Sequence, residues 1–285
     1  MKKNDYSISD LQREDIRTHA DRLLKKASAY GVFPTPTKDI IAASGLSVKY
    51  IQDLLPADCD APESVKRALS KLEGFLHREE KTIYIEKGLG LTRRKFISIH
   101  EVAHHWLPEH QETYQILEDS ATELDEETRD DFERAANCFS SDVLFQLDQF
   151  TMDAMDCPFG IGSPVKLLSK RFGAGNYSTI RRYTQVCGRP AAVLVCDLAS
   201  GSNAALRVRR FIPSQEFERD YGEMIWPEIL PENGWFWRNK PKHTFLVPTP
   251  WVTKTPSGER LEFIVEGFDS KRNIFFLIYP EALSS

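Results

Sequence analysis

The sequence predicts an α+β protein with a helix-rich N-terminal part that holds a small sheet, a short helical segment, and a C-terminal part dominated by antiparallel strands. Apolar residues recur at helical spacing in the first half, whereas short runs of branched and aromatic residues dominate the last third. The 285 residues exceed what one small core needs. We therefore expect three parts, at residues 1–155, 156–187 and 188–285.

Composition excludes several classes of protein. The longest apolar runs, such as Ala191–Cys196 and Ile274–Tyr279, are far shorter than the roughly 20 residues that span a bilayer, so no membrane insertion is expected. No apolar signal segment follows the polar N-terminus, which predicts a cytoplasmic protein. Five cysteines without a CxxC pair indicate reduced thiols. The net charge of -5 gives no overall attraction to nucleic acid.

The first part begins with alternating helices and short strands. We expect helices over residues 9–30, 35–45 and 64–72, a strand over 46–50, and a β-hairpin formed by Gly74–His77 and Thr82–Glu86. If Thr82–Glu86 is the edge of its sheet, it could pair with an extended peptide. A helix over 91–107 should stop at Pro108, and the acidic stretch Glu118–Asp131 is interpreted as a solvated connection before a helix that extends to about Leu147.

The second part has the outline of a helix-turn-helix. Pro164–Phe172 and Ser178–Val186 flank a glycine-containing turn and carry basic side chains: Lys166, Lys170, Arg171, Arg181 and Arg182. DNA binding by these helices is weakly supported because the chain is acidic overall. Packing beside the first domain is the favoured role.

The third part contains five candidate strands and an aromatic cluster. The strands are Ala191–Leu198, Ala205–Phe211, Phe245–Val247, Leu261–Glu266 and Ile274–Tyr279. The aromatic residues are Trp226, Trp235, Phe236, Trp237 and Trp251. Such clusters are usually core, although a pocket for a small signal molecule or a surface for a partner protein is an alternative.

The sequence His100-Glu101-Val102-Ala103-His104 is an HExxH motif on a predicted amphipathic helix. A spacing of four puts both imidazoles on one helix face, where they can bind the same tetrahedral Zn²⁺. Glu101 points about 100° away, where its carboxylate can take a proton from a water that attacks a carbonyl. Unpaired histidines in so apolar a segment would be costly, which favours a metal site.

A catalytic zinc site needs a third protein ligand, and two residues compete for that role. His110 has the outer spacing of a metzincin motif, but Leu107 and Pro108 stand where the glycine of that motif turns the chain. Glu133 lies on the later helix, where small neighbours would allow close packing. We prefer Glu133, although residue chemistry alone hardly separates it from its acidic neighbours.

The chain resembles the ImmA/IrrE family of metallopeptidases. Arg93–His104 is similar to the family's R-x-x-F-x-x-x-H-E-x-x-H, Glu133–Phe139 to its E-x-x-A-N-x-F, and the Pro36–Gly45 helix to a family helix that begins with proline, contains isoleucine and ends at glycine. The resemblance covers about residues 15–147. It departs at Val143–Gln146, where the family often has Leu-Leu-Met-Pro, so the loop on one side of the cleft is expected to differ.

The resemblance implies a zincin-like domain in which His100, His104 and Glu133 bind zinc and Glu101 is the general base. It further implies an endopeptidase that cleaves a helix-turn-helix transcriptional repressor in stress response or mobile-element control, and a C-terminal sensor domain resembling GAF. Mn²⁺ could replace Zn²⁺ in cells. His105 and Tyr84 are candidate donors to the tetrahedral oxyanion.

Two other functions remain open at the level of sequence. One is a transcriptional regulator or ligand sensor whose metal site is structural or degenerate. The other is a toxin–antitoxin or phage-defence component on the same fold.

Overall fold

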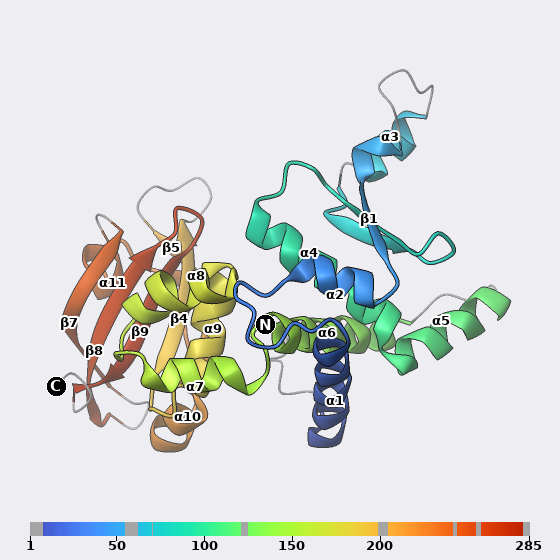
Figure 1. The fold of residues 1–285 in the computed structure, drawn as a ribbon. Coiled ribbons are helices and arrows are strands. Elements are labelled where there is room, and N and C mark those ends of the chain that lie inside the picture. Colours follow the sequence, from blue (N-terminus) through green and yellow to red (C-terminus); the bar gives the residue numbers. More distant parts are fainter. Residues whose placement is uncertain are drawn as a thin grey trace. The chain divides into compact units, whose positions relative to one another are not determined.

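The computed structural model describes residues 8–54, 62–69, 71–120, 125–198, 205–241, 244–254 and 258–281. It confirms a mixed helix and sheet structure with a curled antiparallel sheet toward the C-terminus (Figure 1). The chain forms two compact units. The first comprises Met1–Phe150 with Lys170–Gly175, and the second comprises Thr151–Ser169 with Asn176–Ser285.

The first unit combines helices with one small sheet. Its elements are α1 (Asp10–Lys26), α2 (Thr37–Ala43), β1 (Ser47–Tyr50), α3 (Glu63–Leu69), β2 (Gly74–His77), β3 (Thr82–Ile85), α4 (Leu91–Trp106), α5 (Pro108–Ser120) and α6 (Glu126–Leu144). Two long helices begin at side-chain caps. Ser9 accepts the backbone N–H of Gln12 at the start of α1, and Asp125 accepts that of Thr128 at the start of α6.

The core of the first unit lies between α1, α4 and α6, in which α6 packs against both α1 and α4. Each helix contributes side chains that are at most 3 % exposed: Ala20, Leu23 and Leu24 from α1, Ile99, Val102 and Ala103 from α4, and Ala135, Ala136 and Phe139 from α6. Burial of these apolar faces fixes the rotation of α4 and α6 about their axes. Their polar residues therefore meet at a defined place.

The small sheet corrects one expectation. Its strand order is β1-β3-β2, with β3 parallel to β1 and antiparallel to β2. The strand over Thr82–Ile85 is thus central, not an edge, and its four residues are all buried. The hairpin itself is present as predicted. The edge next to α4 is β2, which packs directly against that helix.

The region around Pro108 also differs from expectation. Pro108 does stop α4, but it is also the first residue of α5, a position that suits proline because the first helical N–H needs no partner. Leu107 makes the bend in an extended conformation, with φ -75° and ψ 123°. The acidic stretch is partly helical, since α5 reaches Ser120 and α6 starts at Glu126.

Phe172 completes the first unit from a distant part of the sequence. It belongs to α8 (Ser169–Phe172) and is fully buried. Its ring contacts those of Phe33, Phe145 and Phe150, with centroids 5.2, 5.8 and 5.2 Å away. Four aromatic rings thus meet at this end of the unit.

The second unit is built on a six-stranded antiparallel sheet with the order β6-β5-β4-β9-β8-β7. The strands are β4 (Ala192–Leu198), β5 (Leu206–Pro213), β6 (Ile229–Leu230), β7 (Phe245–Lys254), β8 (Arg260–Asp269) and β9 (Ile274–Pro280). The helical elements are the π-helical turn Pro164–Leu168, α9 (Asn176–Val186), α10 (Gln215–Tyr221) and α11 (Trp235–Arg238); α7 (Asp148–Asp156) joins the two units.

One face of the large sheet carries the aromatic cluster. Phe236 and Trp251 are 5 and 8 % exposed and belong to the hydrophobic core there, while Trp226, Trp235 and Trp237 pack against it partly buried. The five predicted strands are all present. The helix-turn-helix and GAF-like interpretations, and the division into three parts, stay predictions. In the described residues no helix has the length and apolar character that crossing a membrane requires.

Candidate metal centre

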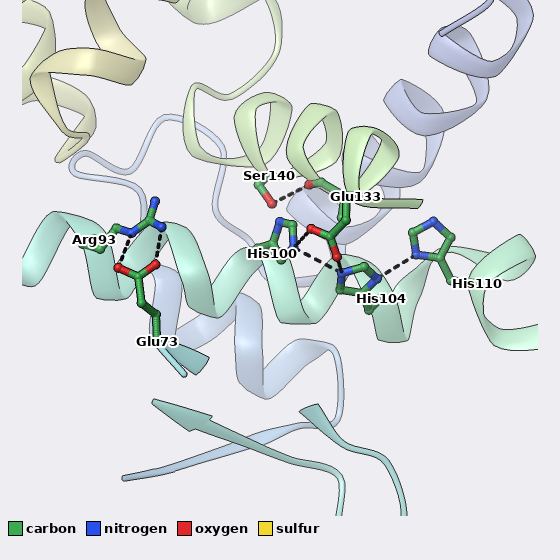
Figure 2. A network of polar contacts seen from close by, with 8 residues as sticks. Glu73, Arg93, His100, His104, His110, Glu133 and Ser140 are labelled. Carbon is green, nitrogen blue, oxygen red and sulfur yellow. Dashed lines mark hydrogen bonds and ion pairs between the residues drawn. The ribbon is translucent and has the colours of Figure 1, made fainter. Parts of the chain in front are cut away.

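Helix α4 presents His100 and His104 one turn apart on the same face. The opposite face is anchored in the core by Ile99 and Val102, neither of which is exposed. Both imidazoles therefore point toward α6, where Glu133 lies between them (Figure 2). Behind Glu133, Ala136 is fully buried, and its small side chain allows α6 to approach α4 closely.

The spacing of the three side chains matches a tetrahedral metal site. Nε2 of His100 and Nε2 of His104 are 3.2 Å apart. One carboxylate oxygen of Glu133 lies 3.1 Å from the first, and the other lies 3.5 Å from the second. Two ligands bound at 2.0–2.1 Å in tetrahedral geometry are about 3.3 Å apart. These residues thus fit Zn²⁺, and in the described part of the chain they form the group of ligand-type side chains close enough to share an ion.

The cluster is open on one side. The side chain of Glu133 is 51 % exposed, whereas that of His104 is 9 % exposed. Solvent or a substrate can therefore reach the position opposite the buried histidines, as a catalytic site requires. The pKa of the Glu133 carboxyl is held well below its usual range, first by its hydrogen bond with His100 and then by that with His104.

Glu101 lies beside the cluster and on the side of β2. Its carboxylate accepts the backbone N–H of Leu76 and interacts electrostatically with His104, His100 and Glu133. Burial is the largest influence on this group and raises the pKa of its carboxyl above the ordinary value. A raised pKa makes the carboxylate a better proton acceptor.

His110 lies behind His104 and not among the three clustered groups. Its Nδ1 is 3.1 Å from Nδ1 of His104, on the ring edge that faces away from Glu133 (Figure 2). His110 is 1 % exposed, and burial lowers the pKa of its imidazole to about 3. The structure therefore brings Glu133 to the histidine pair, whereas His110 contacts the far edge of the His104 ring.

The two candidate oxyanion donors are engaged elsewhere. The hydroxyl of Tyr84 donates to Glu80 over 2.8 Å, and its ring stacks on that of Phe75. His105 hydrogen-bonds to the backbone of Ser44, and burial lowers the pKa of its ring. Both side chains thus contact residues outside the metal cluster and stabilise the fold.

Two residues near the cluster were not singled out from the sequence. The hydroxyl of Tyr114, on α5, hydrogen-bonds with Arg78, and Tyr114 interacts electrostatically with both Glu133 and Glu101. Arg78 stacks its guanidinium 3.9 Å from the Tyr114 ring centroid and donates to the carbonyl of His104 over 3.4 Å. The one sequence signal for Tyr114 is its spacing of four from His110. This spacing places the two residues on one helix face only if both lie on a helix, and α5 was not expected from the sequence.

Comparison with known families agrees with this site. Residues 62–158 match the IrrE N-terminal-like domain, the Peptidase_M78 family. The resemblance to the ImmA/IrrE family is confirmed. All four residues of the site, His100, Glu101, His104 and Glu133, fall inside this IrrE-like domain. No curated protein matches the chain.

The fold of the whole chain is also found in a solved structure. A transcriptional regulator from Mycobacterium tuberculosis superimposes with a TM-score of 0.55 at 16 % sequence identity. The match covers 95 % of this chain and 77 % of that protein. At this identity the likeness concerns the fold alone.

Proposed function

We propose that this protein is a zinc-dependent endopeptidase. The observation that carries the proposal is the cluster of His100, His104 and Glu133 at tetrahedral ligand spacing, with the partly buried Glu101 beside it. The match to a peptidase family over the same residues supports it.

In this proposal the three clustered residues hold the ion and Glu101 handles protons. Bound Zn²⁺ supplies a Lewis acid that activates water and polarises a peptide carbonyl. Glu101 takes the proton from the attacking water and later gives it to the leaving amine. The N–H of Leu76 keeps the carboxylate in place between these steps. Tyr114 interacts electrostatically with Glu133 and Glu101, and Arg78 hydrogen-bonds to its hydroxyl, so these two residues replace Tyr84 and His105 as candidate donors to the oxyanion.

A polypeptide substrate fits the edge of the small sheet. In the described sheet β2 pairs with β3 along one side, and β2 also carries Leu76, which contacts Glu101. An extended peptide added along the other side of β2 would lie near the general base. We propose a regulatory protein as substrate, with a helix-turn-helix transcriptional repressor as the first one to test, in stress response or mobile-element control.

The test uses the purified full chain, Zn²⁺ and a purified helix-turn-helix repressor, chosen from among the products of the neighbouring genes. Wild type should cleave the repressor at one site. Glu101→Gln should keep its zinc and lose about 10²–10⁴-fold in cleavage rate, the range for removing a general base. Glu109→Gln, at an exposed position of α5, is the control and should cleave normally. Full cleavage by Glu101→Gln would reject the assigned base, and metal analysis of wild type before Zn²⁺ is added distinguishes Zn²⁺ from Mn²⁺.

A second candidate is a transcriptional regulator or ligand sensor. It is favoured by the fold likeness to a protein called a transcriptional regulator and by the aromatic cluster of the second unit, which could serve a small molecule or a protein signal. Salt-dependent binding of the full chain to a promoter fragment would support its DNA branch. No binding at low salt would remove that branch.

A further inference from the structure

The two histidines of the cluster differ in what their second ring nitrogen meets. A histidine that binds a metal through Nε2 carries its proton on Nδ1 and almost always donates it to an acceptor. Nδ1 of His104 lies 3.1 Å from Nδ1 of His110. Nδ1 of His100 is buried and has no hydrogen-bond partner among the described residues. Of the two histidines, His104 is therefore the one whose ring a hydrogen bond at Nδ1 can orient.

His110 is held in place by contacts of its own. Its ring stacks on that of Phe132, with centroids 4.1 Å apart and planes inclined by 15°. Phe132 directly precedes Glu133 on α6, so the same turn of helix supplies both the carboxylate and the surface that supports His110. The ring of His110 is also buried, and its Nδ1 faces Nδ1 of His104.

We propose that His110 is a positioning residue of the metal centre: its Nδ1 accepts the Nδ1–H of His104 and holds His104 in the tautomer whose Nε2 lone pair faces the ion. This inference rests on the proposed zinc site. The residue considered as a third ligand from its spacing thus acts on the ion through His104. The proton on His110 then sits on its Nε2.

Two variants separate the hydrogen bond from the packing. His110→Phe keeps an aromatic ring against Phe132 and removes the acceptor. His110→Asn loses the ring and keeps an oxygen near the position of Nδ1. A positioning role predicts that His110→Phe weakens Zn²⁺ affinity by about 10–100-fold, the range for losing such a partner. His110→Asn should stay nearer to wild type, whereas a purely packing role predicts the opposite order.

The assay is competition for Zn²⁺ between the purified full chain and a chromophoric chelator at neutral pH. Equal affinity of His110→Phe and wild type, or a weaker His110→Asn than His110→Phe, would overturn the inference while leaving the zinc site standing. A wild type that takes up no Zn²⁺ would overturn the proposed function as well.

A measurement on wild type guards against variants that fail to fold. In the zinc-bound protein, ¹⁵N chemical shifts should show a protonated Nδ1 on His104 and an unprotonated Nδ1 on His110. A proton on Nδ1 of His110 would contradict the proposed direction of the hydrogen bond.

Discussion

Gly74 sets the distance between the small sheet and the helix that carries the site. A Cβ atom added at Gly74 would lie 2.5 Å from Cγ2 of Ile97 and 3.2 Å from the carbonyl oxygen of Tyr84. Carbon atoms pack best at about 3.5–4.0 Å, so at least about 1 Å of overlap must be relieved by movement. Overpacking of this kind costs about 1–3 kcal/mol. We expect Gly74→Ala to lower the free energy of unfolding by that amount.

The same substitution should disturb the general base. Ile97 lies one turn before Glu101 on the face of α4 that meets β2, so pushing Ile97 away also moves Glu101 from the N–H of Leu76. The proposed cleavage should therefore slow in Gly74→Ala even where the protein remains folded and binds zinc.

A double-mutant cycle with Ile97→Ala, followed by chemical denaturation, tests the reasoning. Ile97→Ala removes the clashing methyl and alone costs about 2–5 kcal/mol. Because the clash is then absent, the double variant should be less destabilised than the sum of the single variants. Gly162→Ala, whose added Cβ meets nothing within 4 Å, is the control and should not destabilise. A Gly74→Ala protein as stable as wild type, or an additive cycle, would refute the proposed clash.

Three further outcomes follow from the site. Glu133→Ala should lose the single equivalent of bound zinc. Glu126→Ala, the control at an exposed position of the same helix, should retain it, and equal metal contents in the two variants would exclude Glu133 as a ligand. Chelation should lower the thermal midpoint, since an ion present at 100 times its Kd adds about 2.7 kcal/mol to folding; an unchanged midpoint would speak against a site formed only in the folded chain. In metal-free protein Glu101→Gln should be more stable than wild type at neutral pH, because burial raises the pKa of Glu101 and so penalises its ionised form. This gain in stability should shrink as the pH falls through the raised pKa of the folded protein toward the pKa of about 4.3 in the unfolded chain. Chemical denaturation at several pH values measures the gain, and a gain that does not change with pH would contradict the reasoning.

The sequence was sufficient where a pattern is local. The spacing of His100, Glu101 and His104 on an amphipathic helix depends on one helical turn, and the structure has that helix. The strands of the second unit are equally local, because their branched and aromatic runs alternate with turns. The pattern of α6 could not show that Glu133 reaches the histidines, since this depends on how closely two helices pack around Ala136.

Two features were beyond local reasoning for identifiable causes. Pro108 reads equally well as the end of one helix and the start of the next, and only the bend at Leu107 decides where His110 goes. The central place of β3 depends on parallel pairing with β1, which lies across a long connection in the sequence. In both cases the missing information was a contact between segments and not a residue preference.

The path of the chain through Phe172 has a practical consequence for anyone who wishes to excise the candidate protease. A fragment that stops after Phe150 would keep Phe33 and Phe145 but lack the ring that fills the space among them. Losing a buried phenylalanine of this kind costs about 3–5 kcal/mol, a large share of the stability of a small domain. Such a truncation is therefore expected to aggregate or misfold, and inactivity of that fragment would say nothing about its chemistry.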